Sequence, residues 1–182
     1  MSTPVDLPAF VAAHAAGQKN QALARQFGLS VSTVKRLKQK LGLGNNDPRN
    51  TLGRLGERLL EQALKAQGFA VTIMAEGHAF DLLVEGQRLE VKTSATLKGN
   101  SCRFRLNERR SSNHAAYRYD KAYQRDADVL ALVVIEEGAL KQLYLLPVAL
   151  WQPSIKVLPE SPFCPYALYR NVTHLLQRPL AA

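Results

Sequence analysis

The chain has 182 residues, of which 46% are hydrophobic and 21% charged, the composition of a folded globular protein; this argues against wholesale disorder. Lys and Arg number 24 against 15 Asp and Glu, and the resulting net charge of +9 favours a polyanionic partner, with nucleic acid the leading candidate. Cys102 and Cys164 lie far apart without a CxxC pair, so the cysteines suggest neither a disulfide framework nor a zinc finger.

The same composition leaves the partner and the location as expectations. A basic protein that never meets DNA stays a second interpretation, because net charge reports on association and not on fold. The apolar stretches are shorter than a membrane helix needs, and the first ten residues lack the features of a secretory signal. We therefore expect a cytoplasmic protein.

Residues 7–43 are predicted to form three short helices, separated by breaks at Gly17 and Gly28. Ser30 or Ser32 can cap the third helix. Its inward face is predicted to hold Val31, Val34, Leu37 and Leu41. The residues expected outside are Ser32, Thr33, Lys35, Arg36 and Lys38.

The second and third helices resemble the bacterial helix-turn-helix, with a small residue at Ala24, the turn glycine at Gly28 and a branched apolar residue at Val34. The resemblance implies that the third helix enters the major groove of double-stranded DNA and that its outward residues bind DNA. A plain helical hairpin with a solvated basic face is the alternative. We predict a helix-turn-helix domain over residues 1–44, a linker over residues 45–52, which contain three asparagines and a proline, and a second domain over 53–182.

A helix is predicted from Gly53 to Gly68, with an apolar stripe that includes Leu60 and Leu64. Glu57 falls on or beside that stripe, where an unpaired carboxylate is costly unless a cation or a hydrogen bond compensates it. A boundary residue paired with Arg54 or Arg58 is the alternative interpretation of Glu57.

Three short β-like runs follow, over residues 69–74, 79–86 and 87–95. If Glu85 and Gly86 form a two-residue turn, Asp81 lies opposite Glu90 and Lys92 shares the face of Glu90. Two facing carboxylates destabilise a sheet least when a divalent cation lies between them. We therefore expect a cation at this point.

An aspartate followed by Glu-Val-Lys, after a helix with the pattern G-x-x-G-E, resembles the PD-(D/E)XK nuclease superfamily across Gly53 to Thr93. The helix and two strands expected up to Pro147 are similar to the intron-encoded homing endonucleases of this superfamily. One departure is Phe80, which stands where the motif has proline.

The resemblance implies an α/β fold: a restriction-endonuclease-like mixed β-sheet core flanked by helices, preceded here by the small all-α helix-turn-helix domain. It also implies a DNA endonuclease that depends on Mg²⁺ or Mn²⁺. Asp81 and Glu90 would be metal ligands, with Glu57 and the carbonyl of Val91 completing the coordination, and Lys92 would activate the attacking water.

The stretch from Thr93 to Arg125 is basic and is predicted to line a DNA groove, although a solvated surface is the alternative. Its basic residues include Arg103, Arg105, Arg109, Arg110, Arg118, Lys121 and Arg125. The tail from Trp151 is rich in proline, and residues 165–172 are predicted to form a strand and then a short helix.

A double-strand cut needs two such sites, so we expect a homodimer on near-palindromic DNA. The tail aromatics Trp151, Phe163, Tyr166 and Tyr169 serve either its interface or the core. Two other functions stay open: a non-catalytic helix-turn-helix regulator with a nuclease-like interaction domain, and a structure-selective junction resolvase.

Overall fold

The computed structural model describes residues 5–44, 48–75, 78–95, 97, 99–108 and 121–177, with the backbone alone at 48–50. The chain divides into two compact units, residues 1–51 and 52–182. Within the described residues, no helix combines the length and the apolar character needed to cross a membrane.

The first unit contains the three predicted helices, α1 Leu7–Ala15, α2 Asn20–Gln26 and α3 Val31–Lys40. Ser30 caps α3, because its hydroxyl accepts the backbone N–H of Thr33 at 3.1 Å. The turn before α3 uses Gly28 at a φ of 63°, which glycine adopts without strain. Val34 is fully buried as predicted, but Val31 is exposed, because the first residue of α3 lies at the edge of the small core.

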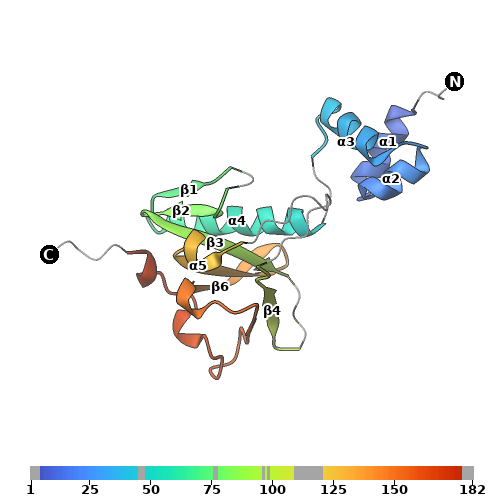
Figure 1. Ribbon diagram of the computed structural model, residues 1–182. Helices are drawn as coiled ribbons and strands as arrows, with labels where there is room; N and C mark the ends of the chain where they lie inside the picture. The colour runs from blue at the N-terminus through green and yellow to red at the C-terminus, as the bar shows by residue number, and fades with distance from the viewer. Residues whose placement is uncertain are drawn as a thin grey trace. The chain divides into compact units, whose positions relative to one another are not determined.

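The second unit is built on a five-stranded mixed sheet (Figure 1). Its strands are β1 Val71–Ile73, β2 Leu82–Val84, β3 Gln87–Ser94, β5 Val129–Glu136 and β6 Ala139–Pro147, in the order β1-β2-β3-β5-β6. Strands β3 and β5 pair in parallel, whereas the other neighbours are antiparallel. The predicted α/β class with a mixed sheet core is therefore confirmed.

The β2–β3 hairpin has the predicted register. Leu82 pairs with Leu89 and Val84 with Gln87, around a turn in which Glu85 and Gly86 have φ values of 49° and 84°. Two consecutive positive φ angles are those of a type I′ turn, whose twist suits a hairpin. The turn therefore fixes which residues of β3 lie near Asp81.

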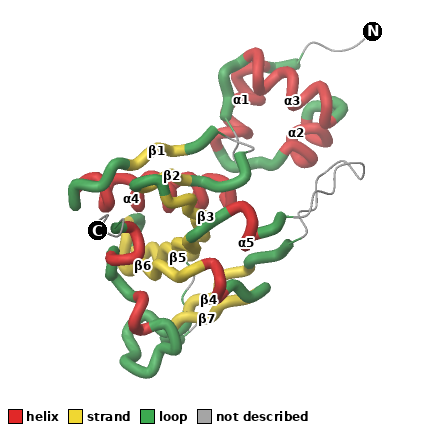
Figure 2. The backbone as a smooth tube through the Cα atoms, turned by 60° about the vertical axis from the view of Figure 1, so that its left-hand side comes forward, coloured by secondary structure: helices red, strands yellow, loops and turns green. Residues whose placement is uncertain are grey.

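Helix α4, Pro48–Ala66, covers one face of the sheet, where its fully buried Leu60 and Leu64 belong to one core cluster with Leu89 and Val91 of β3 (Figure 1). The other face packs against α5 Tyr123–Asp126 and against a small sheet of β4 Cys102–Arg105 and β7 Ser154–Val157, which Figure 2 shows side by side. Short 3₁₀ turns complete the chain at Val148–Leu150, Ala167–Tyr169 and His174–Leu176.

Two predicted boundaries need correction. Helix α4 begins at Pro48, inside the expected linker 45–52, because proline fits the first turn of a helix, where its missing N–H costs nothing. Residues 165–172 form a 3₁₀ turn and one isolated bridge, from Arg170 to Tyr144, and no strand. The strand of the tail is β7 instead, and the prolines at 159, 162 and 165 break any longer pairing after it.

Candidate active site

Asp81 directly precedes β2, where the ladder between β2 and β3 ends. Its N–H donates to the carbonyl of Leu89 at 2.9 Å, and its Oδ2 accepts the N–H of Val91 at 2.7 Å. The carboxylate thus takes the place of a backbone partner and is held against β3. Burial, and then the nearby charge of Glu90, raise the pKa of Asp81.

Glu90 lies on β3 with its side chain fully buried. Its Oε1 is paired with Lys92, and its Oε2 with Lys121. Lys121 is almost completely buried, whereas the Lys92 side chain keeps 22% of its surface exposed. Both ammonium groups lie near the ring of Tyr123, at 5.7 Å for Lys92 and 5.2 Å for Lys121.

Glu57 comes to the same place from α4. Burial raises the pKa of Glu57, and the charges of Asp81 and Glu90 raise it further, while Arg54 and Lys92 act in the opposite direction. Gly56, directly before it, allows this approach, because a Cβ built there would lie 1.9 Å from Oγ1 of Thr93 on β3. The helix backbone therefore packs against the strand that carries Glu90 and Lys92.

The structure thus brings the four predicted catalytic residues, Glu57, Asp81, Glu90 and Lys92, into one electrostatically coupled group. Their roles stay predictions. The carbonyl of Val91, predicted as a metal ligand, lies 3.5 Å from the ammonium of Lys92.

These residues suit a divalent cation by donor chemistry. Glu57 and Asp81 offer hard oxygen atoms, and the carboxylates of the group repel one another, a repulsion that a cation relieves. Across the described part of the chain, however, no three His, Cys, Asp or Glu residues form a cluster that could hold a metal. Because both oxygens of Glu90 are paired with lysines, this carboxylate would exchange a lysine for the cation.

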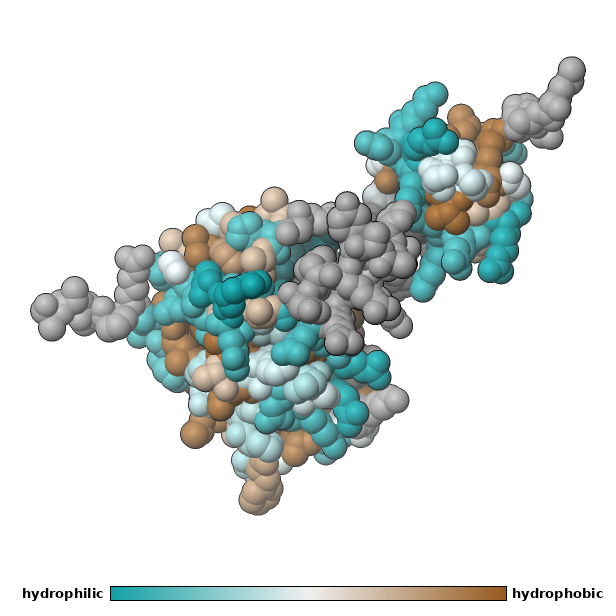
Figure 3. All heavy atoms as spheres, in the orientation of Figure 1, coloured by the Kyte–Doolittle hydropathy of each residue, from teal (hydrophilic) through white to brown (hydrophobic). Residues whose placement is uncertain are grey.

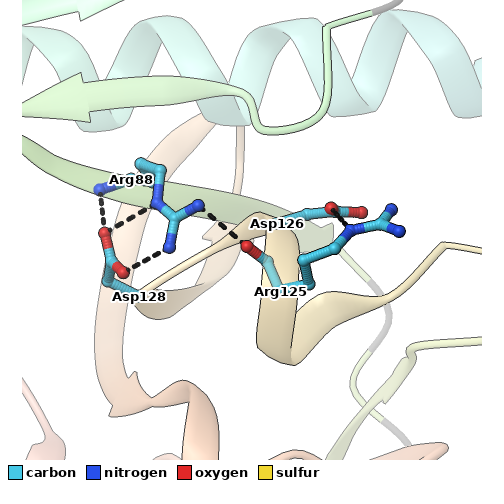
Figure 4. A network of polar contacts seen from close by, with 4 residues as sticks. All are labelled: Arg88, Arg125, Asp126 and Asp128. Atoms are coloured by element: carbon cyan, nitrogen blue, oxygen red, sulfur yellow. Dashed lines mark hydrogen bonds and ion pairs between the residues drawn. The ribbon is translucent and has the colours of Figure 1, made fainter.

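An ion-pair network fixes the neighbouring ends of β3 and β5 (Figure 4). The guanidinium of Arg88 donates to both oxygens of Asp128, at 3.0 and 2.7 Å, and also to the carbonyl of Arg125 at 2.8 Å. The backbone N–H of Arg88 donates to Asp128 as well, at 2.9 Å. These bonds hold the pKa of Asp128 below its usual range and set the parallel register two residues from Glu90.

Lys121 is one residue whose position the sequence did not predict. It was predicted to line a DNA groove, but it is buried on Glu90. A buried carboxylate signals the need for cations to neutralise it, yet the sequence offers many Lys and Arg candidates and does not select this one.

The residues predicted to contact DNA are mostly exposed where the structure describes them. Ser32, Lys35 and Arg36 are exposed on α3, and Thr33 is partly exposed, with its Oγ1 2.8 Å from Oγ of Ser30. Arg103 and Arg105 are exposed on β4. Arg109, Arg110 and Arg118 lie outside the described residues.

Lys38 does not lie outside as predicted. It is only 7% exposed, and its ammonium donates to Oδ1 of Asn20 on α2 at 3.2 Å. Lys38 follows Val34 by four residues, so both side chains lie on the inward face of α3. Burial lowers the pKa of Lys38, and the residue joins α2 to α3.

No protein-family model and no curated protein matches this sequence. Five chains among the solved structures match the fold. One is a bacterial homing endonuclease, I-Ssp6803I, with a TM-score of 0.51 and 17% sequence identity, over 68% of this chain and 89% of that one. At this identity the likeness shows the fold, which is a nuclease-like α/β fold.

Proposed function

We propose that the chain is a DNA endonuclease that hydrolyses phosphodiester bonds at the group formed by Glu57, Asp81, Glu90 and Lys92. The observation that carries the proposal is that half-buried Asp81 lies near the fully buried Glu90, whose charge raises the pKa of Asp81. Glu90 is in turn paired with Lys92, a partly exposed lysine. Carboxyl groups with perturbed pKa values beside other charged groups are typical of functional sites. The fold shared with a bacterial homing endonuclease supports the same conclusion by analogy.

Each side chain has a distinct task in this proposal. Asp81 is oriented by the N–H of Val91 through one oxygen, which directs the carboxylate towards the site. Lys121 stays buried on Glu90 and keeps that carboxylate in place. Lys92, the more exposed of the two lysines, can turn from Glu90 to a scissile phosphate and stabilise its developing negative charge.

We propose Mg²⁺ or Mn²⁺ as the cofactor, held by Asp81 and Glu90 with help from Glu57 and the Val91 carbonyl. When bound, the cation supplies Lewis-acid polarisation of the phosphate and lowers the pKa of a bound water.

The test is cleavage of supercoiled plasmid by the purified chain, with Mg²⁺ and with EDTA. Asp81→Asn and Lys92→Ala are expected to abolish cleavage while duplex binding survives, because both residues act at the scissile phosphate. Lys65→Ala is the matched control, since Lys65 is an exposed lysine of the same unit that pairs with Glu61 on the same helix. Binding without any Mg²⁺-dependent cleavage would instead favour the non-catalytic regulator.

We propose that α3 directs the chain to duplex DNA through Lys35 and Arg36, as in a helix-turn-helix. If so, a chain lacking residues 1–44 loses site preference. Equal cleavage of branched and linear DNA by the full chain would argue against a junction resolvase.

We also propose a homodimer, because one such site cuts one strand. Phe163 and Leu168 are 87% and 83% exposed, which is unusual for large apolar side chains, whereas Trp151, Tyr166 and Tyr169 pack on the core. Sedimentation of the wild-type chain and of Phe163→Ser/Leu168→Ser is the test. A monomer that still makes double-strand breaks would contradict this assembly.

A further inference from the structure

Strands β4 and β7 form a two-stranded antiparallel ribbon whose two faces differ in chemistry; we name it the β4–β7 ribbon. Its inward face is apolar, with Cys102, Phe104, Ile155 and Val157 all buried. Its outward face holds only Arg103, Arg105, Ser154 and Lys156, and each of these is exposed. The alternation of the two strands thus places basic and hydroxyl groups, and no carboxylate, on one surface.

This face has like charges directly opposite each other. Arg103 and Lys156 are Cα partners across the ribbon, an arrangement that destabilises a sheet. Within the described residues, the side chains of Arg103, Arg105 and Lys156 make no hydrogen bond or ion pair.

Elsewhere in the second unit, several basic residues at the surface are paired. Lys65 pairs with Glu61, Arg125 with Asp126, and Lys141 with Glu136 and Glu160. These cations have carboxylates beside them, whereas within the described residues the three basic side chains of the ribbon have none.

We infer that the outward face of the β4–β7 ribbon binds the sugar-phosphate backbone of duplex DNA, with Lys156 as a contact that the sequence did not suggest. The inference rests on the proposed function and assigns it a second DNA surface. Arg103 and Arg105 are two residues apart, about 7 Å along the strand, and phosphates of one DNA strand recur about every 3.4 Å along the helix axis. The ribbon can thus reach separate phosphates.

The chemistry of the face favours phosphate contacts over base reading or membrane binding. Besides Ser154 it offers only cations, which fix position on a duplex but carry no sequence information. It presents no apolar side chain that could enter a lipid layer. On the side of the molecule seen in Figure 3, hydrophilic residues likewise form most of the surface and apolar ones occur in small separate groups.

The experiment measures affinity of the full chain for a short duplex of arbitrary sequence, in EDTA, over a range of salt concentrations. Lys156→Gln is expected to lower the magnitude of the slope of log K against log salt by about 0.9, and Arg103→Gln/Arg105→Gln/Lys156→Gln by about three times as much. Lys141→Gln is the matched control: it removes the same charge from a paired lysine of β6 and is expected to leave the slope unchanged.

A second measurement separates binding from folding. Because Lys156→Gln removes a like-charge pair, its thermal stability is expected to be equal to or above that of the wild type while its DNA affinity falls. A slope equal to that of Lys141→Gln would overturn the inference, and so would stronger capture by anionic lipid vesicles than by the duplex. Loss of slope in a chain that never cleaves would support the ribbon and contradict the nuclease.

Discussion

Gly56 offers a sharp test of how α4 is seated on the sheet. A methyl group at this position would lie 1.9 Å from Oγ1 and 2.8 Å from Cγ2 of Thr93. Rotation of the threonine about χ1 does not relieve the overlap, because its Cβ is itself 2.9 Å away. Either α4 or β3 must therefore move, and Glu57 moves with α4.

Gly53 lies one turn earlier in the same helix, and a Cβ there would meet nothing within 4 Å. Alanine is favoured over glycine in a helix interior by about 1 kcal/mol. This gain applies to Gly53→Ala and Gly56→Ala alike, so the difference between their free energies of unfolding isolates the overlap. Overpacking of this kind costs about 1–3 kcal/mol.

The assay is urea unfolding followed by the fluorescence of Trp151, the single tryptophan, which stacks on Tyr123 and so reports on the second unit. Gly53→Ala is expected to be more stable than the wild type, and Gly56→Ala less stable than Gly53→Ala by the amount above. Thr93→Ala in the Gly56→Ala background removes Oγ1 and Cγ2 and restores part of the loss. Equal stability of the two alanine variants would refute the close approach of α4 to β3.

Other substitutions test the charges. In metal-free buffer Asp81→Asn is expected to raise the free energy of unfolding, because burial and repulsion disfavour the charge of Asp81. Glu90→Gln is expected to lower the free energy of unfolding by about 3–5 kcal/mol, because it leaves the buried Lys121 unpaired. The same urea assay measures both, and a change in the same direction for the two variants would contradict these roles. Asp128 has a pKa held low by its bonded guanidinium, so its stabilising contribution is present above the unfolded value of about 3.9 and is lost as the pH falls through the lower folded value. Asp128→Asn should therefore flatten the acid side of the stability curve, and an unchanged curve would speak against the network. Lys38→Met is expected to leave duplex affinity nearly unchanged and Lys35→Met to weaken it, as measured by fluorescence anisotropy; the reverse order would place Lys38 on the DNA.

The sequence predicted most of what positions the site. A two-residue turn with glycine at its second position allows one hairpin register, and that register places Asp81 beside β3 and puts Glu90 and Lys92 on one face. The apolar spacing of α4 predicted Glu57 at the edge of its buried stripe, where the structure has it half-buried. Local rules were sufficient at these positions, because each depends on neighbours in sequence.

Long-range contacts could not be predicted in this way. The burial of Lys121 depends on its packing against a carboxylate 31 residues earlier in the chain. Lys38 was misplaced because its type suggests the surface, although its spacing from Val34 assigns it to the inward face. The pairing of β4 with β7 joins segments about fifty residues apart, and neither segment has a sequence feature that identifies the other as its partner.

Groups of charged residues whose charges are not balanced by their neighbours are candidates for functional sites. Several surface cations of the second unit have carboxylates beside them, as in the Arg88–Asp128 network. The carboxylate group at Asp81 and the β4–β7 ribbon depart in opposite directions, one with more negative groups than its lysines balance and the other with positive groups alone. Each unbalanced group lowers the stability of the isolated chain, and a bound partner of opposite charge would offset the loss. In the proposed function the first would take a divalent cation and the second the phosphates of DNA, so a phosphodiester bound together with the cation would satisfy both.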